Sequence, residues 1–235
     1  MHSYTLRGML DARGETPESP FIDQAQTRFN TVNAGFVLRT RSLLNRIVGD
    51  AELHPRLVNT LSMLEHMGSR KIMATQAGPA IDQPTLRHLA EECHHAFFMK
   101  RQAEKVAGRP LEFADKDLLA PRAGRMYFQR LEATMLRRLE REAGSHATYL
   151  YMSMIVELRA VWFYSLYEQV LTRHAHTMSL KRLLGEERNH LTDMAGRLEH
   201  AGELSDDRVD AFVRSEHSLY DRLLNSLQQS VNRGA

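Results

Sequence analysis

Apolar residues recur at helical spacing along most of the chain. Near the N-terminus Phe29, Val32 and Phe36 stand three or four residues apart, which places them on one face of a helix. No segment alternates apolar and polar residues over the length of a strand, so we expect no significant sheet. The pattern predicts an all-α protein with helices over residues 26–48, 55–75, 85–107, 122–142, 146–173, 179–202 and 206–231.

Glycine, proline and serine mark where these helices end and begin. Gly78 and Pro84 indicate a turn before the third helix, and Gly108 ends it. Residues 109–121 then read as a loop. Ser179 is placed to cap the helix that follows it.

The two ends of the pattern suggest one domain with a loose leader. Residues 1–24 contain glycine and proline and show little periodicity, so we expect them to be loosely ordered. Residues 25–235 are expected to form a single helical domain. With 43% hydrophobic and 26% charged residues, the chain resembles a soluble globular protein in composition.

Charge and cysteine content narrow the function classes. The formal net charge is +2, from 31 basic and 29 acidic residues, which gives no reason to expect nucleic acid or an acidic membrane as a partner. Cys93 is the only cysteine, so an intrachain disulfide is impossible. There is no apolar run of membrane-spanning length and no secretory signal at the N-terminus. We therefore expect a cytoplasmic protein without a membrane span.

Glutamate and histidine form an ordered pattern on four of the predicted helices. A lone Glu is followed by Glu-x-x-His, and the sequence repeats this arrangement once. Residues three apart on a helix project from the same side. Carboxylate and imidazole ligands together suit iron or manganese. The pattern predicts a site for two divalent metal ions, with six ligands: Glu65, Glu92, His95, Glu157, Glu187 and His190.

Ligands inside a helical bundle must lie on the apolar side of each helix. On the third helix two overlapping pairs compete, and the side that carries Glu92 and His95 is the more apolar. We therefore prefer that pair and expect Glu91 and His94 at the flank or surface. Cys93, inside the same motif, we interpret as a packing residue.

The lone glutamate of the second repeat has a competitor. Glu168 shares an apolar stripe with Glu157 but lies three turns further along the helix, about 16 Å away at 1.5 Å per residue. The two glutamates cannot both bind one metal centre. We prefer Glu157 because its interval to Glu187 resembles that between the first two glutamates; Glu168 stays the alternative.

Ion pairing is the metal-free interpretation of these glutamates. A buried carboxylate is costly unless it is paired or binds a metal. Salt bridges between helices would meet that requirement, and the chain would then be a helical scaffold. The basic residues considered for this role are Arg70, Lys71, Arg159 and Arg182.

The two Glu-x-x-His runs resemble those of the ferritin-like di-iron carboxylate superfamily. Glu92-Cys-His-His95-Ala resembles the Glu-x-x-His-Ala run of bacterioferritins, and Glu186-Glu187-Arg-Asn-His190 resembles their Glu-Glu-x-x-His run. In length and motif spacing the chain is most similar to aldehyde-deformylating oxygenases. The resemblance implies a four-helix bundle core over about 55–203, with extra N-terminal, crossover and C-terminal helices.

The resemblance also implies a role for each ligand. Glu65 and His95 would hold one metal ion, Glu157 and His190 the other, and the remaining glutamates of the pattern would bridge them. The six residues would then form the catalytic site, with two iron ions as the cofactor and a manganese–iron pair as the alternative. Arylamine N-oxygenases carry a further histidine one turn before the second bridging glutamate, where this chain has Leu183.

These features predict an oxygen-activating di-iron oxidase or oxygenase. The segment Trp162-Phe163-Tyr164 near Glu157 favours a small hydrophobic or aromatic organic substrate. Because no redox domain is evident, electrons are expected from a separate donor or from the substrate. A ferroxidase or iron-storage protein is the alternative function, and a homodimer is left open.

Overall fold

The computed structural model describes residues 20–76, 78, 81–139 and 145–233. Within these ranges the chain is helical and forms no strand, so the predicted all-α class is confirmed. The elements are α2 (Pro20–Val32), η1 (Ala34–Phe36), α3 (Val37–Val48), α4 (Leu53–Thr75), α5 (Gln83–Ala107), η2 (Asp115–Asp117), α6 (Pro121–Leu139), α7 (Ser145–Arg173), α8 (Lys181–His200) and α9 (Asp206–Arg233).

The prediction of one helix over residues 26–48 is wrong in two respects. The helix begins earlier, at Pro20, whose ring suits the first position of a helix; residues 20–24 are therefore helical, while 1–19 lie outside the described residues. It is also interrupted after Val32 by the short 3-10 turn η1. Asn33 lies at this break. Its side-chain amide donates a hydrogen bond of 2.9 Å to the carbonyl of Phe29 and accepts one of 2.7 Å from the Arg159 guanidinium.

Capping residues explain two other helix boundaries. Asp82 caps α5, because its carboxylate accepts a hydrogen bond of 2.9 Å from the Thr85 amide. Gly108 ends α5 with φ of 65°, a conformation that glycine adopts without strain. Ser179 does not occupy the cap position of α8, which belongs to Leu180. The predicted helix end at 140–142 lies outside the described residues.

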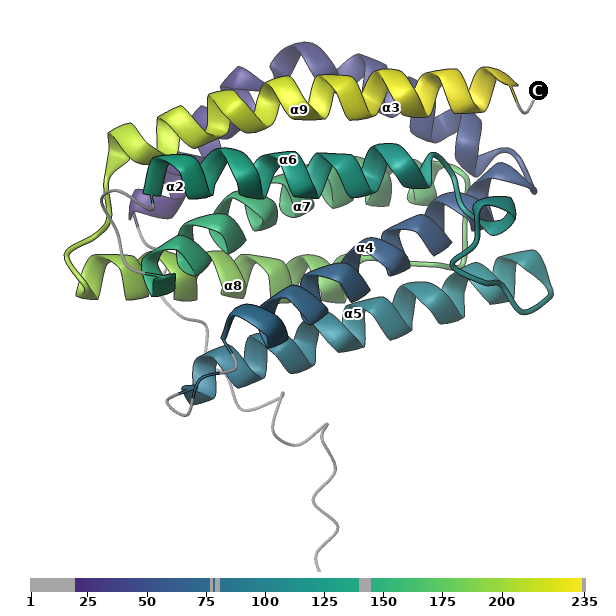
Figure 1. Ribbon diagram of the computed structural model, residues 1–235. Coiled ribbons are helices and arrows are strands. Elements are labelled where there is room, and N and C mark those ends of the chain that lie inside the picture. The colour runs from purple at the N-terminus through teal and green to yellow at the C-terminus, as the bar shows by residue number, and fades with distance from the viewer. Residues whose placement is uncertain (1–19, 77, 79–80, 140–144, 234–235) are drawn as a thin grey trace, which may run out of the picture.

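Two helical hairpins form the lower part of the molecule as drawn (Figure 1). α4 packs closely along α5, and α7 packs along α8. The two hairpins meet where α5 contacts α8. The six metal ligands predicted from the sequence lie on these four helices.

The remaining helices cover α7 from its other side. α6 and α9 run side by side, and α2 and α3 pack against α7 and α9 (Figure 1). Because α7 contacts helices on several sides, it is apolar nearly all round. Most of the buried apolar side chains of α2 to α9 belong to one continuous core. In the described part of the chain, no helix has the length and apolar character needed to cross a bilayer.

A buried ion pair ties the covering helices to α7. Arg159 donates from Nε and Nη2 to the two carboxylate oxygens of Glu216 on α9, both at 2.7 Å. Tyr127 on α6 donates to the same carboxylate at 2.6 Å. All three side chains are buried. This network of hydrogen bonds joins α6 and α9 to α7.

Candidate metal centre

The structure brings all six predicted ligands together between the two hairpins. They fall into two groups, and within each group one ligand atom per residue lies within 4.8 Å of the others. The first group spans α4, α5 and α8, and the second spans α5, α7 and α8. Their members are Glu65, Glu92, His95 and Glu187, and His88, Glu92, Glu157 and His190.

Two glutamates connect the groups. Glu92 belongs to both. Glu187 places Oε1 3.3 Å from Nδ1 of His95 and Oε2 3.1 Å from Nδ1 of His190. One carboxylate therefore faces a histidine of each group. This is the geometry expected of carboxylates that lie between two ions.

His88 is a member of the site that the sequence analysis missed. Its Nε2 lies 3.3 Å from Glu157 Oε1 and 3.5 Å from Glu92 Oε1, and its Nδ1 lies 2.7 Å from the Tyr149 hydroxyl. The signal was present in the sequence, because His88 stands one turn before Glu92 and residues four apart share a helix face. On α8, the position one turn before Glu187 is occupied by Leu183. On α5, the corresponding position one turn before Glu92 is occupied by His88.

The outward nitrogens of two histidines are held by glutamates of the opposite motif. His95 Nε2 lies 3.1 Å from Glu186, and His190 Nε2 lies 2.8 Å from Glu91. Such partners fix the ring orientation and leave Nδ1 of each ring for the centre. The expectation that Glu91 lies at the flank or surface is wrong: α8 covers it, and it is 7% exposed.

Other candidates of the sequence pattern lie elsewhere. Glu168 accepts hydrogen bonds from the Leu180 amide at 2.6 Å and the Ser179 hydroxyl at 3.0 Å, so it stabilises the start of α8 and lies outside both groups. His94 is exposed, as expected. Cys93 is also exposed and is therefore not a packing residue, because it lies on the side of α5 opposite the ligands.

Basic side chains do not neutralise the site. Of the residues considered for ion pairing, Arg159 pairs with Glu216, Lys71 with Glu132 and Arg182 with Glu186. Within the described ranges, no Lys or Arg forms an ion pair with any carboxylate of the two groups. Among the described residues, the groups of opposite charge that face these carboxylates are histidines. The interpretation that lysine and arginine pair with these glutamates therefore has no support in this geometry.

Burial and crowding of like charges shift the proton affinities of these groups. Burial raises the pKa of Glu187 to about 8, with Glu157 adding to the effect. Burial and the neighbouring Glu92 raise the pKa of Glu65 well above its usual value. Burial would lower the pKa of His88, but the hydrogen bond to Glu157 and the nearby Glu92 carboxylate outweigh this effect and raise that pKa to about 10. Burial thus favours the protonated form of Glu65 and Glu187, and the carboxylates around His88 favour its charged form.

Two orphaned polar atoms test whether metal ions fit. Glu92 Oε1 and His95 Nδ1 are buried and make no hydrogen bond in the described structure. Leaving buried polar atoms without a partner is costly. A cation between the ligands would satisfy both, and the oxygen and nitrogen donor set suits iron or manganese. Gly68 leaves room beside the shared carboxylate, since a Cβ there would lie 3.4 Å from Glu92 Oε2.

Two cavities reach the ligands from the side that α6 covers. The larger, about 430 Å³, is lined by His88, Glu92 and Glu157 together with apolar residues of α4, α6 and α7 and a smaller area of polar groups that includes Lys71 and Glu132. The smaller, about 110 Å³, reaches Glu65 and Tyr164. Tyr164 donates a hydrogen bond to Glu65. The site is therefore buried, yet it adjoins space for a small molecule.

Comparison of the chain with models of protein families, with curated proteins and with solved structures finds no match. The function of the site is accordingly inferred from its own residues and geometry.

Proposed function

We propose that this protein is an oxygen-activating, non-haem di-iron oxidoreductase of the ferritin-like carboxylate type, acting on a small hydrophobic or aromatic molecule. The observation that carries the proposal is the pair of ligand groups that share Glu92 and adjoin a largely apolar chamber. Two four-residue groups with a common carboxylate suit two ions bound close together. The chamber supplies the space for an organic substrate.

The ligand assignment follows the two groups. Glu65 and His95 would hold one ion, and Glu157, His190 and His88 the other, with Glu92 and Glu187 between them. When bound, two ferrous ions supply the electrons that reduce dioxygen. The two positions differ, because one group contains a single imidazole and the other contains two. This asymmetry keeps a manganese–iron pair as the alternative cofactor.

The protein's own residues orient the ligands and shape the substrate space. Glu91 and Glu186 fix the rings of His190 and His95. Phe128 and Val156 line both cavities and keep water from the ligands. A volume of about 430 Å³ lies within the range of small-molecule sites. The chamber favours an enzyme that acts on an organic substrate over a ferroxidase, because a ferroxidase needs only a path for iron.

Metal content tests the proposal first. Protein produced with added iron is expected to contain about two iron ions per chain, because each ligand group offers one site. Glu92→Ala and His190→Ala should lose most of this iron, and His88→Ala should lose up to half of it. His94→Ala is the matched control, since His94 is an exposed histidine of the same helix and should retain all the iron.

A wild-type chain that binds no transition metal, or ligand variants that retain all their iron, would contradict the proposal.

Oxygen consumption then distinguishes an oxygenase or oxidase from a ferroxidase. An oxygenase or oxidase should consume oxygen together with an organic compound and yield an altered organic product. A ferroxidase should consume oxygen with ferrous iron alone and leave every organic compound unchanged.

A further inference from the structure

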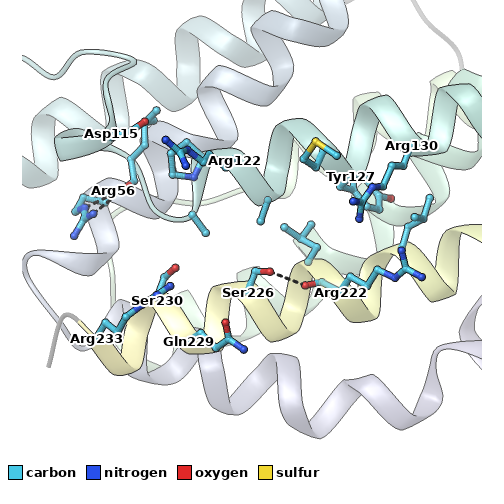
Figure 2. Close-up of a pocket in the computed structure, with 17 residues that line it drawn as sticks. Arg56, Asp115, Arg122, Tyr127, Arg130, Arg222, Ser226, Gln229, Ser230 and Arg233 are labelled. Carbon is cyan, nitrogen blue, oxygen red and sulfur yellow. Dashed lines mark hydrogen bonds between the residues drawn. The ribbon is translucent and has the colours of Figure 1, made fainter.

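A positively charged hollow of about 480 Å³ lies between α6 and α9 (Figure 2). Arginines from both helices and from α4 line it, and among its described lining residues Asp115 is the one acidic side chain. The arginines are Arg56, Arg122, Arg130, Arg222 and Arg233.

In the described part of the chain, four of these arginines form no ion pair: Arg122 and Arg130 of α6, and Arg222 and Arg233 of α9. Arg28 and Arg39, by contrast, pair with the α9 residues Asp206 and Asp221. Cations gathered around a hollow repel each other unless an anion lies among them. The hollow thus has the charge of an anion-binding site.

The hollow also adjoins the apolar cavity that reaches the ligand groups. Ala120, Tyr127 and Leu223 line both spaces. From there the 110 Å³ cavity extends between apolar side chains to Glu65 and Glu92. Most of the side chains that line this cavity are apolar, so it suits the apolar part of a ligand.

We propose that this arginine-lined hollow binds the acid group of an organic anion whose apolar part enters the cavity towards the ligand groups. The inference rests on the proposed function and narrows its substrate to an amphipathic acid. Guanidinium groups bind carboxylate and phosphate with paired hydrogen bonds. A recessed hollow suits such a head group better than the broad surface of a partner protein, which would need a larger contact area.

Calorimetric titration of the full chain with decanoate and decyl phosphate tests the inference. At least one of the two is expected to bind, and 1-decanol and acetate should each bind at least tenfold more weakly. Arg130→Gln/Arg222→Gln should weaken binding of the anion at least tenfold. The matched control is Arg138→Gln/Arg214→Gln, which removes one exposed arginine from each of the same helices outside the hollow and should bind as the wild type does.

A second variant tests the path of the chain. Leu223→Trp fills the wall common to both spaces and should weaken decanoate at least tenfold while leaving acetate unaffected. Circular dichroism checks that each variant is folded. Equal binding of 1-decanol and decanoate, unchanged binding in Arg130→Gln/Arg222→Gln, or unchanged binding in folded Leu223→Trp would each overturn the inference.

Iron content, measured on the same samples, separates the two proposals. A chain that binds decanoate through the arginines but holds no metal contradicts the proposed function and leaves the anion site standing. A chain that holds iron but binds neither anion overturns the anion site alone.

Discussion

At the scale of the residue, each Glu-Glu-x-x-His run supplies both a ligand and a support. Glu92 and Glu187 face the ligand groups, while the preceding Glu91 and Glu186 each hold a histidine of the other run. Burial opposes ionisation of Glu186, but hydrogen bonds from His95 and Arg182 lower its pKa to about 2. It is therefore ionised at neutral pH and keeps the Nε2 proton of His95 in place.

His54 makes folding stability depend on pH. It is buried on α4, with Nε2 2.7 Å from the Tyr167 hydroxyl. Burial, and then the nearby His176, lower its pKa to about 4 from 6.5. Above pH 6.5 the ring is neutral in both states; below it the unfolded chain takes up a proton that the folded chain does not. We expect His54 to cost about 2 kcal/mol of stability at pH 5.

Urea unfolding of metal-free protein at pH 8 and pH 5 measures this effect. Wild type should lose about 2 kcal/mol more on acidification than His54→Gln, whose side chain does not titrate. Equal losses in the two proteins would contradict the assignment. Because both are compared without metal, titration of the ligand groups affects them alike.

Some residues of the site could be predicted from the sequence and others could not. Spacing between motifs was enough to prefer Glu157 over Glu168, and the structure brings Glu157 into the second ligand group. His88 lies outside the repeated motif, so a search for Glu-x-x-His alone passes over it. The burial of Glu91 depends on how α8 lies against α5, which no single-helix pattern specifies.

At the scale of the element, periodicity predicted the helices well and the interruption at Asn33 not at all. Asn33 and Gly35 are weak helix formers, but the apolar spacing continues across them, so periodicity alone gives no sign of the break. The side chain of Asn33 also accepts a hydrogen bond from Arg159, far away in the sequence. Local preference and a tertiary contact thus act together at the break between α2 and α3.

Gly68 on α4 tests what the space beside Glu92 is for. Glycine inside a helix costs roughly 0.5–1 kcal/mol relative to alanine. Gly68→Ala should therefore stabilise the fold by about this amount, since its Cβ meets only Glu92 Oε2, at 3.4 Å. The methyl group restricts the shared carboxylate, so iron affinity should fall by about tenfold.

Gly196→Ala is the matched control for this change. Gly196 is exposed on α8, and a Cβ there meets nothing within 4 Å. Gly196→Ala should stabilise the fold as much as Gly68→Ala does, as measured by thermal unfolding, and should leave the iron affinity unchanged. Equal iron affinity in both variants would show that Glu92 needs no additional room.

At the scale of the molecule, the covering helices create the spaces that the ligand-bearing hairpins lack. α6 lines the three cavities described above, and α9 lines the arginine hollow and the cavity of about 110 Å³. The sequence predicts that α6 and α9 exist but not where they lie. Their position follows from buried contacts such as Arg159 with Glu216, which join residues from distant parts of the chain.

Removing one partner of that buried pair tests its structural role. Arg159→Met leaves the Glu216 carboxylate buried with Tyr127 as its one remaining hydrogen-bond donor among the described residues, and should cost about 3–5 kcal/mol of folding stability. Arg159→Met/Glu216→Leu removes both charges and should recover most of this loss. Urea unfolding measures both. A single variant that costs under about 1 kcal/mol would show that α9 is held by its apolar contacts alone.

The exposed thiol of Cys93 gives the chain a single point of chemical attachment. Its neighbours on α5 include Glu92 and His95, which face the opposite way. A spin label placed there would sit across one helix, roughly 10 Å thick with its side chains, from the proposed ions. Paramagnetic metal would shorten the relaxation of the label, so filling of the centre could be followed spectroscopically without any knowledge of the substrate.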